Sequence, residues 1–375
     1  MPAPSLTDLP RTRPRSRQLP LFPPAVERSF NQLPALGEQG DIQYFGTWSR
    51  SALNPPAATG MSFWSVNPYV GCAFGCTYCY ARYAHRYVME RAAADDRLAG
   101  AAEHDAGRVP PWLAFERHIF VKRNAARLLA HALRQGSERH LALVHGDGIV
   151  IGTATDPYQP AERRYGVTRA LLDVLAEHPG LRLTIITKSP LVTRDVDLLA
   201  RIARNSSLSV HISLITLDRA LARRLEPRAP TPEARLRAVR RLHEAGIDVV
   251  VNCMPVLPGI TDHPRDLAAL VQRAAEAGAA DVATDVLRLQ HEARKRYLPF
   301  IAREFPELAG RYARTYAQAS VPGESYRQGL SALMERLRRA HGLRRRRYGE
   351  RDTGAGAPPG AASASLADIQ LVLPL

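Results

Sequence analysis

The chain has 375 residues, 45% of them hydrophobic, which is enough apolar material for one large domain or two domains of ordinary size. It contains no run of eighteen or more apolar residues, and its N-terminal stretch lacks the apolar segment of a secretory signal, so we expect a cytoplasmic protein that does not enter a membrane. The formal net charge of +15 fits contact with nucleic-acid phosphates, but an arginine-rich composition inherited from a GC-rich genome explains it equally well.

Both ends of the chain differ in composition from its centre. Residues 1–40 are rich in Pro and Arg, and residues 351–375 are rich in Gly, Ala, Ser and Pro. Such segments bury too little apolar surface to fold alone, so we predict a disordered basic arm and a low-complexity tail. Residues 306–350 show helical periodicity and end in a basic run, which predicts a C-terminal helical extension.

The centre, over residues 60–305, alternates between short β-branched runs and longer stretches of helical period. The predicted strands are residues 64–68, 148–154, 181–187, 208–214, 247–254 and 281–287, and the predicted helices are residues 162–177, 191–204, 231–245 and 264–277. This alternation indicates βαβ units and a parallel sheet. Eight units take about 250 residues, and residues 91–111 form an insertion that we interpret as a solvated loop or lid. The predicted fold class is therefore α/β, with a partial (β/α)6 barrel.

The first predicted strand leads into a cluster of cysteines. Cys72, Cys76 and Cys79 are three of the four cysteines in the chain and follow the spacing C-x3-C-x2-C, with Tyr78 directly before the third. Clustered thiols in a cytoplasmic chain suggest a metal site, whereas disulfides need an even, dispersed set. An iron–sulfur cubane normally takes four thiolates, so three leave one iron open to a substrate or cosubstrate. Tyr78 could shield such a cluster from water.

Other interpretations of the cysteines stay open at this point. Zinc could bind the three thiolates together with His85, although structural zinc sites usually draw on two separated pairs. A closed iron–sulfur cluster would need Cys253 as its fourth ligand. A redox pair would use a single C-x-x-C and would leave the third cysteine unexplained.

The cysteine motif after a first strand resembles the signature of the radical S-adenosylmethionine (SAM) superfamily. Further segments are similar to its spore-photoproduct-lyase-like branch, often labelled DNA repair photolyases: residues 67–69, 155–160 with Glu162, 187–189, 225–228 and 255–261. The resemblance covers about residues 63–289. It implies a partial barrel with a [4Fe–4S] cluster at its carboxyl-terminal mouth.

The same resemblance implies a mechanism. SAM would chelate the open iron through its amino and carboxylate groups. One electron, supplied to the cluster by a partner such as flavodoxin or ferredoxin, would split SAM into methionine and a 5′-deoxyadenosyl radical. That radical would abstract hydrogen from a substrate held across the barrel mouth.

Polar side chains at the ends of the predicted strands are further candidates, because function gathers at the carboxyl ends of barrel strands. Thr153, Thr155 and Asp156 end the second strand, where the superfamily usually contacts the methionine amino group; Asp156 could instead cap a turn or a helix. Lys188 could pair with the SAM carboxylate or a substrate phosphate, or face solvent. Ser213 could donate to ribose or carboxylate, or be satisfied locally.

Cys253 ends the fifth predicted strand and is a candidate catalytic residue. Its thiol could return a hydrogen atom to a substrate radical, or it could be a small buried hydrophobe, as free cysteines usually are. Spore photoproduct lyase uses a hydrogen-donating cysteine soon after the cluster motif. No cysteine lies between Cys79 and Cys253 here, so reversal of a thymine dimer by that route is not expected.

Three functions follow from these features. The first is a lyase-like radical SAM enzyme that acts on a nucleic acid or nucleotide. The second is radical modification of a peptide or small metabolite. The third is a non-catalytic iron–sulfur protein that binds nucleic acid and acts as a sensor.

Overall fold

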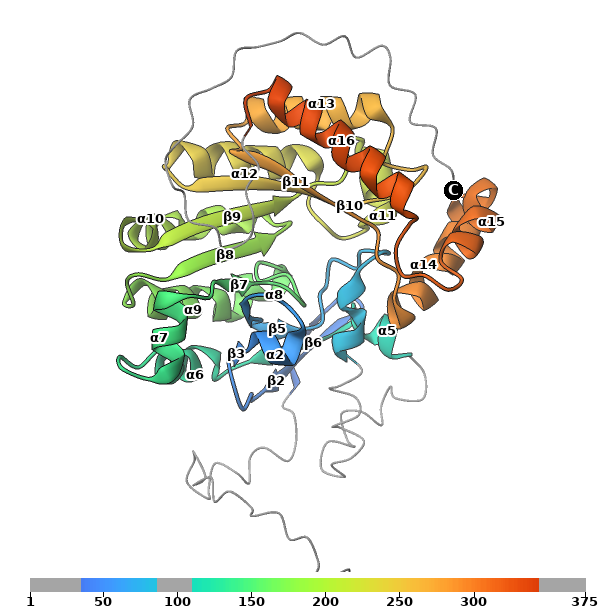
Figure 1. Cartoon of the computed structure of the whole chain (residues 1–375). Helices are drawn as coiled ribbons and strands as arrows, with labels where there is room; N and C mark the ends of the chain where they lie inside the picture. The colour runs from blue at the N-terminus through green and yellow to red at the C-terminus, as the bar shows by residue number, and fades with distance from the viewer. Residues whose placement is uncertain (1–34, 86–109, 344–375) are drawn as a thin grey trace, which may run out of the picture.

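A computed structural model describes residues 35–85 and 110–343 (Figure 1). The tail expected over residues 351–375, nearly all of the insertion expected over residues 91–111, and the first 34 residues of the expected arm lie outside the described residues. Within the described ranges, each helix is too short or too polar to cross a membrane.

A parallel sheet forms the centre of the fold. Its strand order is β11-β10-β9-β8-β7-β4-β3, so each parallel strand lies beside its neighbour in sequence. Strands β4 to β11 of this sheet pair in parallel, and β3 is antiparallel to β4. The strands are β3 Leu53–Asn54, β4 Trp64–Val66, β7 Ile149–Ile151, β8 Arg182–Thr187, β9 Ser207–Ser213, β10 Asp248–Val256 and β11 Asp281–Val286. The predicted partial barrel of six parallel strands is confirmed, and it is open.

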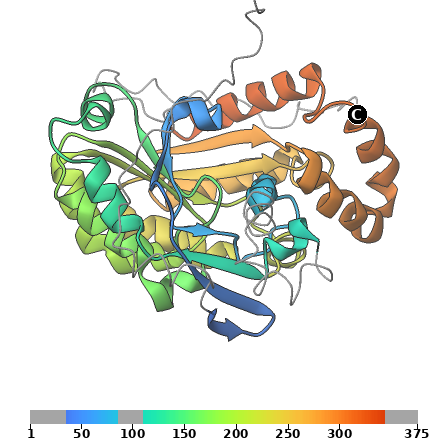
Figure 2. The ribbon, with the colours of Figure 1, turned by 90° about the horizontal axis from the view of Figure 1, so that it is seen from below.

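Helices follow the strands; those predicted over residues 191–204, 231–245 and 264–277 are present, and others were not predicted. The helices are α2 Pro56–Thr59, α6 Ala125–Ala132, α7 Glu138–His145, α8 Pro160–Tyr165, α9 Val167–Ala176, η3 Pro190–Asp195, α10 Val196–Asn205, α11 Arg219–Leu225, α12 Pro232–Glu244 and α13 Pro264–Glu276. Local signals set their starts: Thr231 caps α12 and Asp218 caps α11, each by accepting backbone N–H hydrogen bonds. Figure 2 shows α9, α10 and α12 together on one side of the molecule.

The single helix predicted over residues 162–177 is wrong, because the chain breaks there into α8 and α9. Gly166 lies between them with a φ of 62°, a left-handed conformation that ends α8. The buried carboxylate of Glu162 then accepts from the backbone N–H groups of Thr168 and Arg169 and so caps α9. A cap contributed from six residues upstream has no simple spacing signature.

A second, four-stranded sheet was not predicted. It comprises β1 Ala35–Gln39, β2 Ile42–Thr47, β5 Tyr69–Val70 and β6 His118–Lys122, in the order β1-β2-β6-β5. The expectation of disorder up to residue 40 is wrong for residues 35–39, because β1 pairs with β2. Strand β5 runs directly into residues 71–79, which carry the three clustered cysteines and are called the cysteine loop below, so this sheet supports one side of the loop.

The C-terminal helices cover two parts of the molecule. They are α14 His291–Glu304, α15 Pro306–Thr315 and α16 Glu324–Ala340, so the extension begins before the predicted residue 306. Helix α16 packs its apolar side on the main core, and Arg338 on it donates to the carbonyl of Val282, 2.8 Å away. Helices α14 and α15 pack instead around the cysteine loop, with the short helices η2 Tyr80–Arg82 and α5 Pro111–Ala114.

His85 lies fully buried beside the apolar cluster that α14 and α15 form with the cysteine loop. Its ring packs against Phe115, His118 and Phe120 at centroid distances of 5.4 to 6.4 Å. Burial, with the neighbouring His118, lowers the pKa of His85 to about 3. In the folded protein the imidazole therefore stays neutral at pH values well below the ordinary pKa of histidine.

We predict that His85 makes the fold acid-sensitive and that His85→Phe removes this sensitivity. Below about pH 6.5 His85 is protonated in the unfolded chain, whereas in the folded protein it stays neutral down to about pH 3. Between these two pH values the free energy of unfolding therefore falls by about 1.4 kcal/mol per pH unit. Urea unfolding of the iron-free protein at pH 6.5 and 4.5 measures this. The drop should be about 2–3 kcal/mol smaller in His85→Phe than in the wild type. Parallel pH profiles would contradict the prediction.

Candidate functional site

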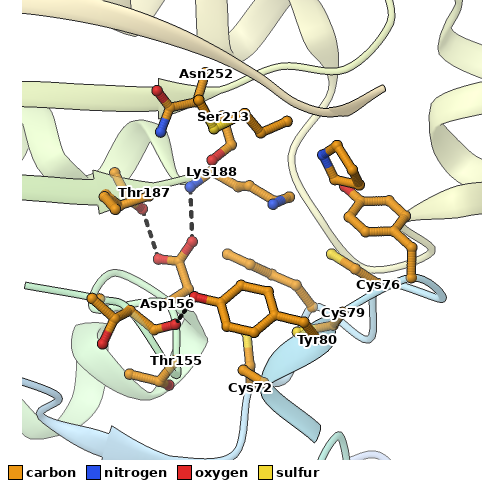
Figure 3. A pocket seen from close by; sticks show the side chains of 18 of the residues that line it. Cys72, Cys76, Cys79, Tyr80, Thr155, Asp156, Thr187, Lys188, Ser213 and Asn252 are labelled. Atoms are coloured by element: carbon orange, nitrogen blue, oxygen red, sulfur yellow. Dashed lines mark hydrogen bonds between the residues drawn. The ribbon is translucent and has the colours of Figure 1, made fainter. Parts of the chain in front are cut away.

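The three clustered cysteines line one cavity of about 400 Å³ at the carboxyl ends of the parallel strands (Figure 3). Cys72, Cys76 and Cys79 form one wall. The opposite wall carries polar residues at or just after the ends of β7, β8 and β9 and one from within β10, namely Thr153, Thr155, Asp156, Thr187, Lys188, Ser213 and Asn252. The structure thus brings together nine of the ten residues that the sequence singled out, counting Tyr78, which also lines the cavity.

Glycines allow the cysteine loop to approach its surroundings closely. Gly71 has a φ of +86°, and a Cβ there would lie 2.8 Å from the carbonyl oxygen of Phe115. The same carbonyl accepts from the backbone N–H of Cys72 at 2.9 Å. Gly75 has a φ of +66°, and a Cβ there would lie 2.9 Å from the Arg228 guanidinium. Larger residues would push the thiols out of position.

The fully buried side chain of Gln159 ties the loop to the end of β7. Its Oε1 accepts from the backbone N–H of Ala73 at 2.9 Å, and its Nε2 donates to the carbonyl of Gly71 at 3.1 Å. The hydroxyl of Thr155 donates to the same carbonyl at 2.6 Å. Thr155 was predicted to bind the cofactor, but its hydroxyl donates to the loop instead.

Two arginines hold the other side of the loop. Arg228 donates through Nε to the carbonyl of Ala73 at 2.6 Å. Arg82 is fully buried, donates to the carbonyl of Cys76 at 2.8 Å and forms an ion pair with Glu116 at 2.5 Å. Backbone carbonyls of the loop thus point outward to fixed cations, which leaves the thiols free to face the cavity.

Burial makes the thiols poor anions without a partner cation. It raises the pKa of Cys76 to about 12 and raises the pKa of Cys72 and Cys79 as well. All four cysteines of the chain are free thiols. Buried thiolates become favourable only when metal cations replace their protons. The donor set therefore fits an iron–sulfur cluster chemically.

A single metal ion fits less well. Among residues 35–85 and 110–343, no three His, Cys, Asp or Glu side chains are grouped to hold one metal ion. His85, the fourth zinc ligand considered from the sequence, does not line the cavity. The three thiols do line one cavity, and a multi-iron cluster takes each of its thiolates on a different iron.

Asp156 joins the ends of β7 and β8. One carboxylate oxygen accepts from the Thr187 hydroxyl at 2.6 Å and the Tyr158 N–H at 2.9 Å, and the other accepts from the backbone N–H of Lys188 at 2.7 Å (Figure 3). Burial raises the pKa of Asp156, although these hydrogen bonds oppose the rise. The turn-capping interpretation holds, and because a carboxylate accepts up to about four hydrogen bonds, Asp156 keeps capacity for a cationic ligand.

Thr153 is engaged by two residues that the sequence analysis did not single out as ligands. Asn67 donates to its hydroxyl at 3.1 Å and accepts from the Ala154 N–H at 2.8 Å. Tyr80 donates to its carbonyl and remains 45% exposed at the cavity edge. In the sequence, the one signal that Tyr80 lies at the cavity is its position directly after the third cysteine.

A buried charge network lies behind Cys76. The Tyr78 hydroxyl and the Arg235 guanidinium both donate to Glu226, and the Lys188 ammonium lies 3.8 Å from the same carboxylate. Burial alone would raise the pKa of Glu226, but the Arg235 and Lys188 charges hold it below its ordinary value. Glu226 therefore stays an anion that orients Tyr78 and Lys188. Arg235 also donates to the carbonyl of Ser213 at 3.0 Å.

Strand β10 presents alternate residues to opposite faces, and this excludes Cys253 from the cavity. Asn252 and Met254 line the cavity, whereas Cys253 is 0% exposed in the core between the sheet and the outer helices. The prediction of Cys253 as a catalytic residue is therefore wrong; it is the small buried hydrophobe considered as its alternative. The same placement removes it as a fourth cluster ligand.

We predict that Gln159→Met weakens the cysteine loop. The change keeps the volume but leaves the buried Ala73 N–H without its partner, which should lower the free energy of unfolding by about 2 kcal/mol. Urea unfolding and iron content per chain after reconstitution measure the effect. Gln272→Met on α13, where the amide contacts only Glu276, is the matched control. Equal behaviour of the two variants would contradict the role given to Gln159.

Comparisons with known proteins agree with this geometry. The family model described as the radical SAM superfamily matches residues 66–271. An uncharacterized protein of Mycobacterium tuberculosis is 36% identical over 291 residues, which cover 77% of this chain and 78% of that protein. An uncharacterized protein of Methanocaldococcus jannaschii is 26% identical over 214 residues, 57% of this chain and 68% of that protein.

Solved structures show the same fold. A mutant of spore photoproduct lyase has a TM-score of 0.57 and 16% identity, covering 82% of this chain and 84% of that chain. The lyase complexed with dinucleoside spore photoproduct has a TM-score of 0.54 and 15% identity, covering 82% and 83%. The superfamily model spans more than half of the sequence and contains the cysteine loop and the four parallel strands from β7 to β10. The chain therefore belongs to the radical SAM superfamily.

Proposed function

We propose that Cys72, Cys76 and Cys79 hold a [4Fe–4S] cluster and that the chain is an enzyme that reductively cleaves SAM. Membership in the superfamily implies radical chemistry based on SAM. The observation that carries the proposal is the shared cavity, in which three thiols face a wall of polar strand ends (Figure 3). When bound, the cluster supplies the electron that breaks the sulfonium bond and yields the 5′-deoxyadenosyl radical.

The polar wall of the cavity suits the groups of SAM. Asp156 offers an anion to the SAM ammonium, and Lys188 offers a cation to its carboxylate. Ser213, at the end of β9, and Asn252, within β10, offer hydrogen bonds to ribose hydroxyls. Thr153 and Thr155 act at one remove, because their contacts fix the loop and Asn67.

Apolar residues of the chain keep water from the same place. Phe74, Tyr78 and Phe115 line the cavity beside the thiols, and each is at most 5% exposed. Exclusion of water protects a reactive carbon radical from side reactions and strengthens the charge contacts of Asp156 and Lys188. The bound substrate would close the exposed edge at Tyr80.

A nucleic acid or nucleotide is the first candidate for the substrate. The support is the fold shared with spore photoproduct lyase, one solved structure of which holds a dinucleoside photoproduct, together with the net charge of +15. A peptide or small metabolite is the second candidate, since the cavity of about 400 Å³ also suits a compact substrate. The buried position of Cys253 removes one thiol route for returning hydrogen to the substrate.

The sensor function is the weaker alternative. A protein that only senses oxygen or iron has no use for a polar cavity beside its cluster. Here the cavity is lined by strand ends from β7 to β11 and contains both an anion and a cation. This arrangement favours an enzyme.

We expect the anaerobically reconstituted protein to form 5′-deoxyadenosine when dithionite and SAM are added. Cys76→Ala should lower product to background, because the loss of a thiolate ligand removes the cluster. Cys253→Ala is the matched control and should keep product within about twofold of the wild type, because Cys253 faces away from the cavity. Liquid chromatography of the quenched reaction measures the product. A wild-type protein that carries the cluster and makes no 5′-deoxyadenosine would contradict the enzyme and favour the sensor.

A further inference from the structure

Arginines gather on the surface outside the cysteine loop. We define the basic face as Arg117, Arg224, Arg228, Arg296 and Arg303, whose side chains are between 21% and 65% exposed. Three carboxylates connect them: Asp41 contacts Arg117 and Arg228, Glu116 contacts Arg296, and Glu304 contacts Arg224 and Arg303.

The basic face keeps an excess of positive charge. Its five guanidinium groups and the buried Arg82 share the three connecting carboxylates. Arg296 shows the consequence: burial lowers its pKa, and the nearby charges of Arg82 and Arg303 lower it further although Glu116 opposes them. Such a face attracts anionic surfaces at a distance and orients them on approach.

The basic face connects directly to the cysteine loop. The Arg228 side chain reaches from the surface to the carbonyl of Ala73, the residue after Cys72. Arg296 contacts Glu116, which pairs with Arg82, which donates to the carbonyl of Cys76. One or two side chains therefore separate solvent from the loop on this side.

The basic face and the cavity lie on different sides of the loop. None of the five arginines is among the described residues that line the cavity. Figure 1 shows the supporting helices α5 and α14 together beside the cysteine segment, on the opposite side of the molecule from α10. SAM and substrate need the cavity, so a protein that reduces the cluster must approach from elsewhere, and it must approach closely.

We propose that the basic face docks a small acidic electron-transfer protein that reduces the cluster. This rests on the proposed function, because it needs a cluster on the three cysteines. One electron passes from the reduced donor, which is oxidised by one electron, to the cluster, which is reduced by one; no bond forms or breaks. Electron-transfer encounters use small, charge-steered interfaces, and a patch of five arginines suits one.

Position favours an electron donor over a nucleic acid at this face. A nucleic-acid substrate must place its reacting carbon in the cavity, whereas a donor must only reach the back of the loop. The arginines are also held in fixed contacts, by backbone carbonyls and carboxylates, which suits the repeated docking of one rigid partner. Nucleic-acid binding here is the competing outcome of the test.

The test reverses two exposed charges of the basic face. Arg117→Glu with Arg303→Glu, in the reconstituted full-length holoenzyme, should raise the KM for reduced flavodoxin by about tenfold or more. The readout is 5′-deoxyadenosine formation with enzymatically reduced flavodoxin as the donor. Dithionite, a small reductant that needs no docking surface, should support the same rate in the variant and the wild type.

A matched control makes the same charge change elsewhere. Arg201→Glu with Arg240→Glu alters exposed residues of α10 and α12, and its KM for flavodoxin should stay within about twofold of the wild type. Unchanged flavodoxin kinetics in Arg117→Glu/Arg303→Glu would overturn the inference, and loss of oligonucleotide binding alone would assign the face to nucleic acid instead. Failure of the proposed function is distinct, because then dithionite also yields no product in the wild type.

Discussion

The structure depends on one constraint: three thiols, two buried and one partly buried, must face a single cavity while other parts of the chain hold the backbone of their loop in place. Gly71 and Gly75 let the loop bend, and Gln159 and Arg228 bind its backbone from the two sides. Both of these residues come from the partial barrel, and the segment between α5 and β6 adds the Phe115 carbonyl, which accepts from the Cys72 N–H. Both sheets are needed because a loop of this kind cannot fix its own shape.

Buried ion pairs also lie directly behind the cysteine loop. Glu226 lies between Arg235 and Lys188 behind Cys76, and Arg82 pairs with Glu116 behind Cys79. These buried ions are paired and hydrogen-bonded, as buried ions must be. The Lys188 ammonium and the Asp156 carboxylate line the cavity, whereas the excess of arginine lies on the basic face outside the loop. One side of the loop is thus suited to a zwitterionic ligand and the other to an acidic protein.

The sequence predicts the parts of this arrangement that are encoded locally. Six parallel strands follow from alternating apolar runs, and the cavity wall follows from the rule that strand ends meet at one edge, as Asp156 and Lys188 do. The second sheet escaped prediction because β5 has two residues and pairs with β6 some fifty positions later. Gln159 and Arg228 lie in segments that resemble the family, but their contacts with the loop were not predicted because the partners lie 86 and 155 residues away. Cys253 was misplaced because its face depends on a register that reverses with every residue.

The most direct measurement is the electron paramagnetic resonance spectrum of the dithionite-reduced, reconstituted protein before and after SAM is added. We expect a cubane signal whose g values shift when SAM is added, and no such signal in Cys76→Ala. A cubane signal that SAM leaves unchanged would show that the three thiolates do not leave one iron open to the cavity.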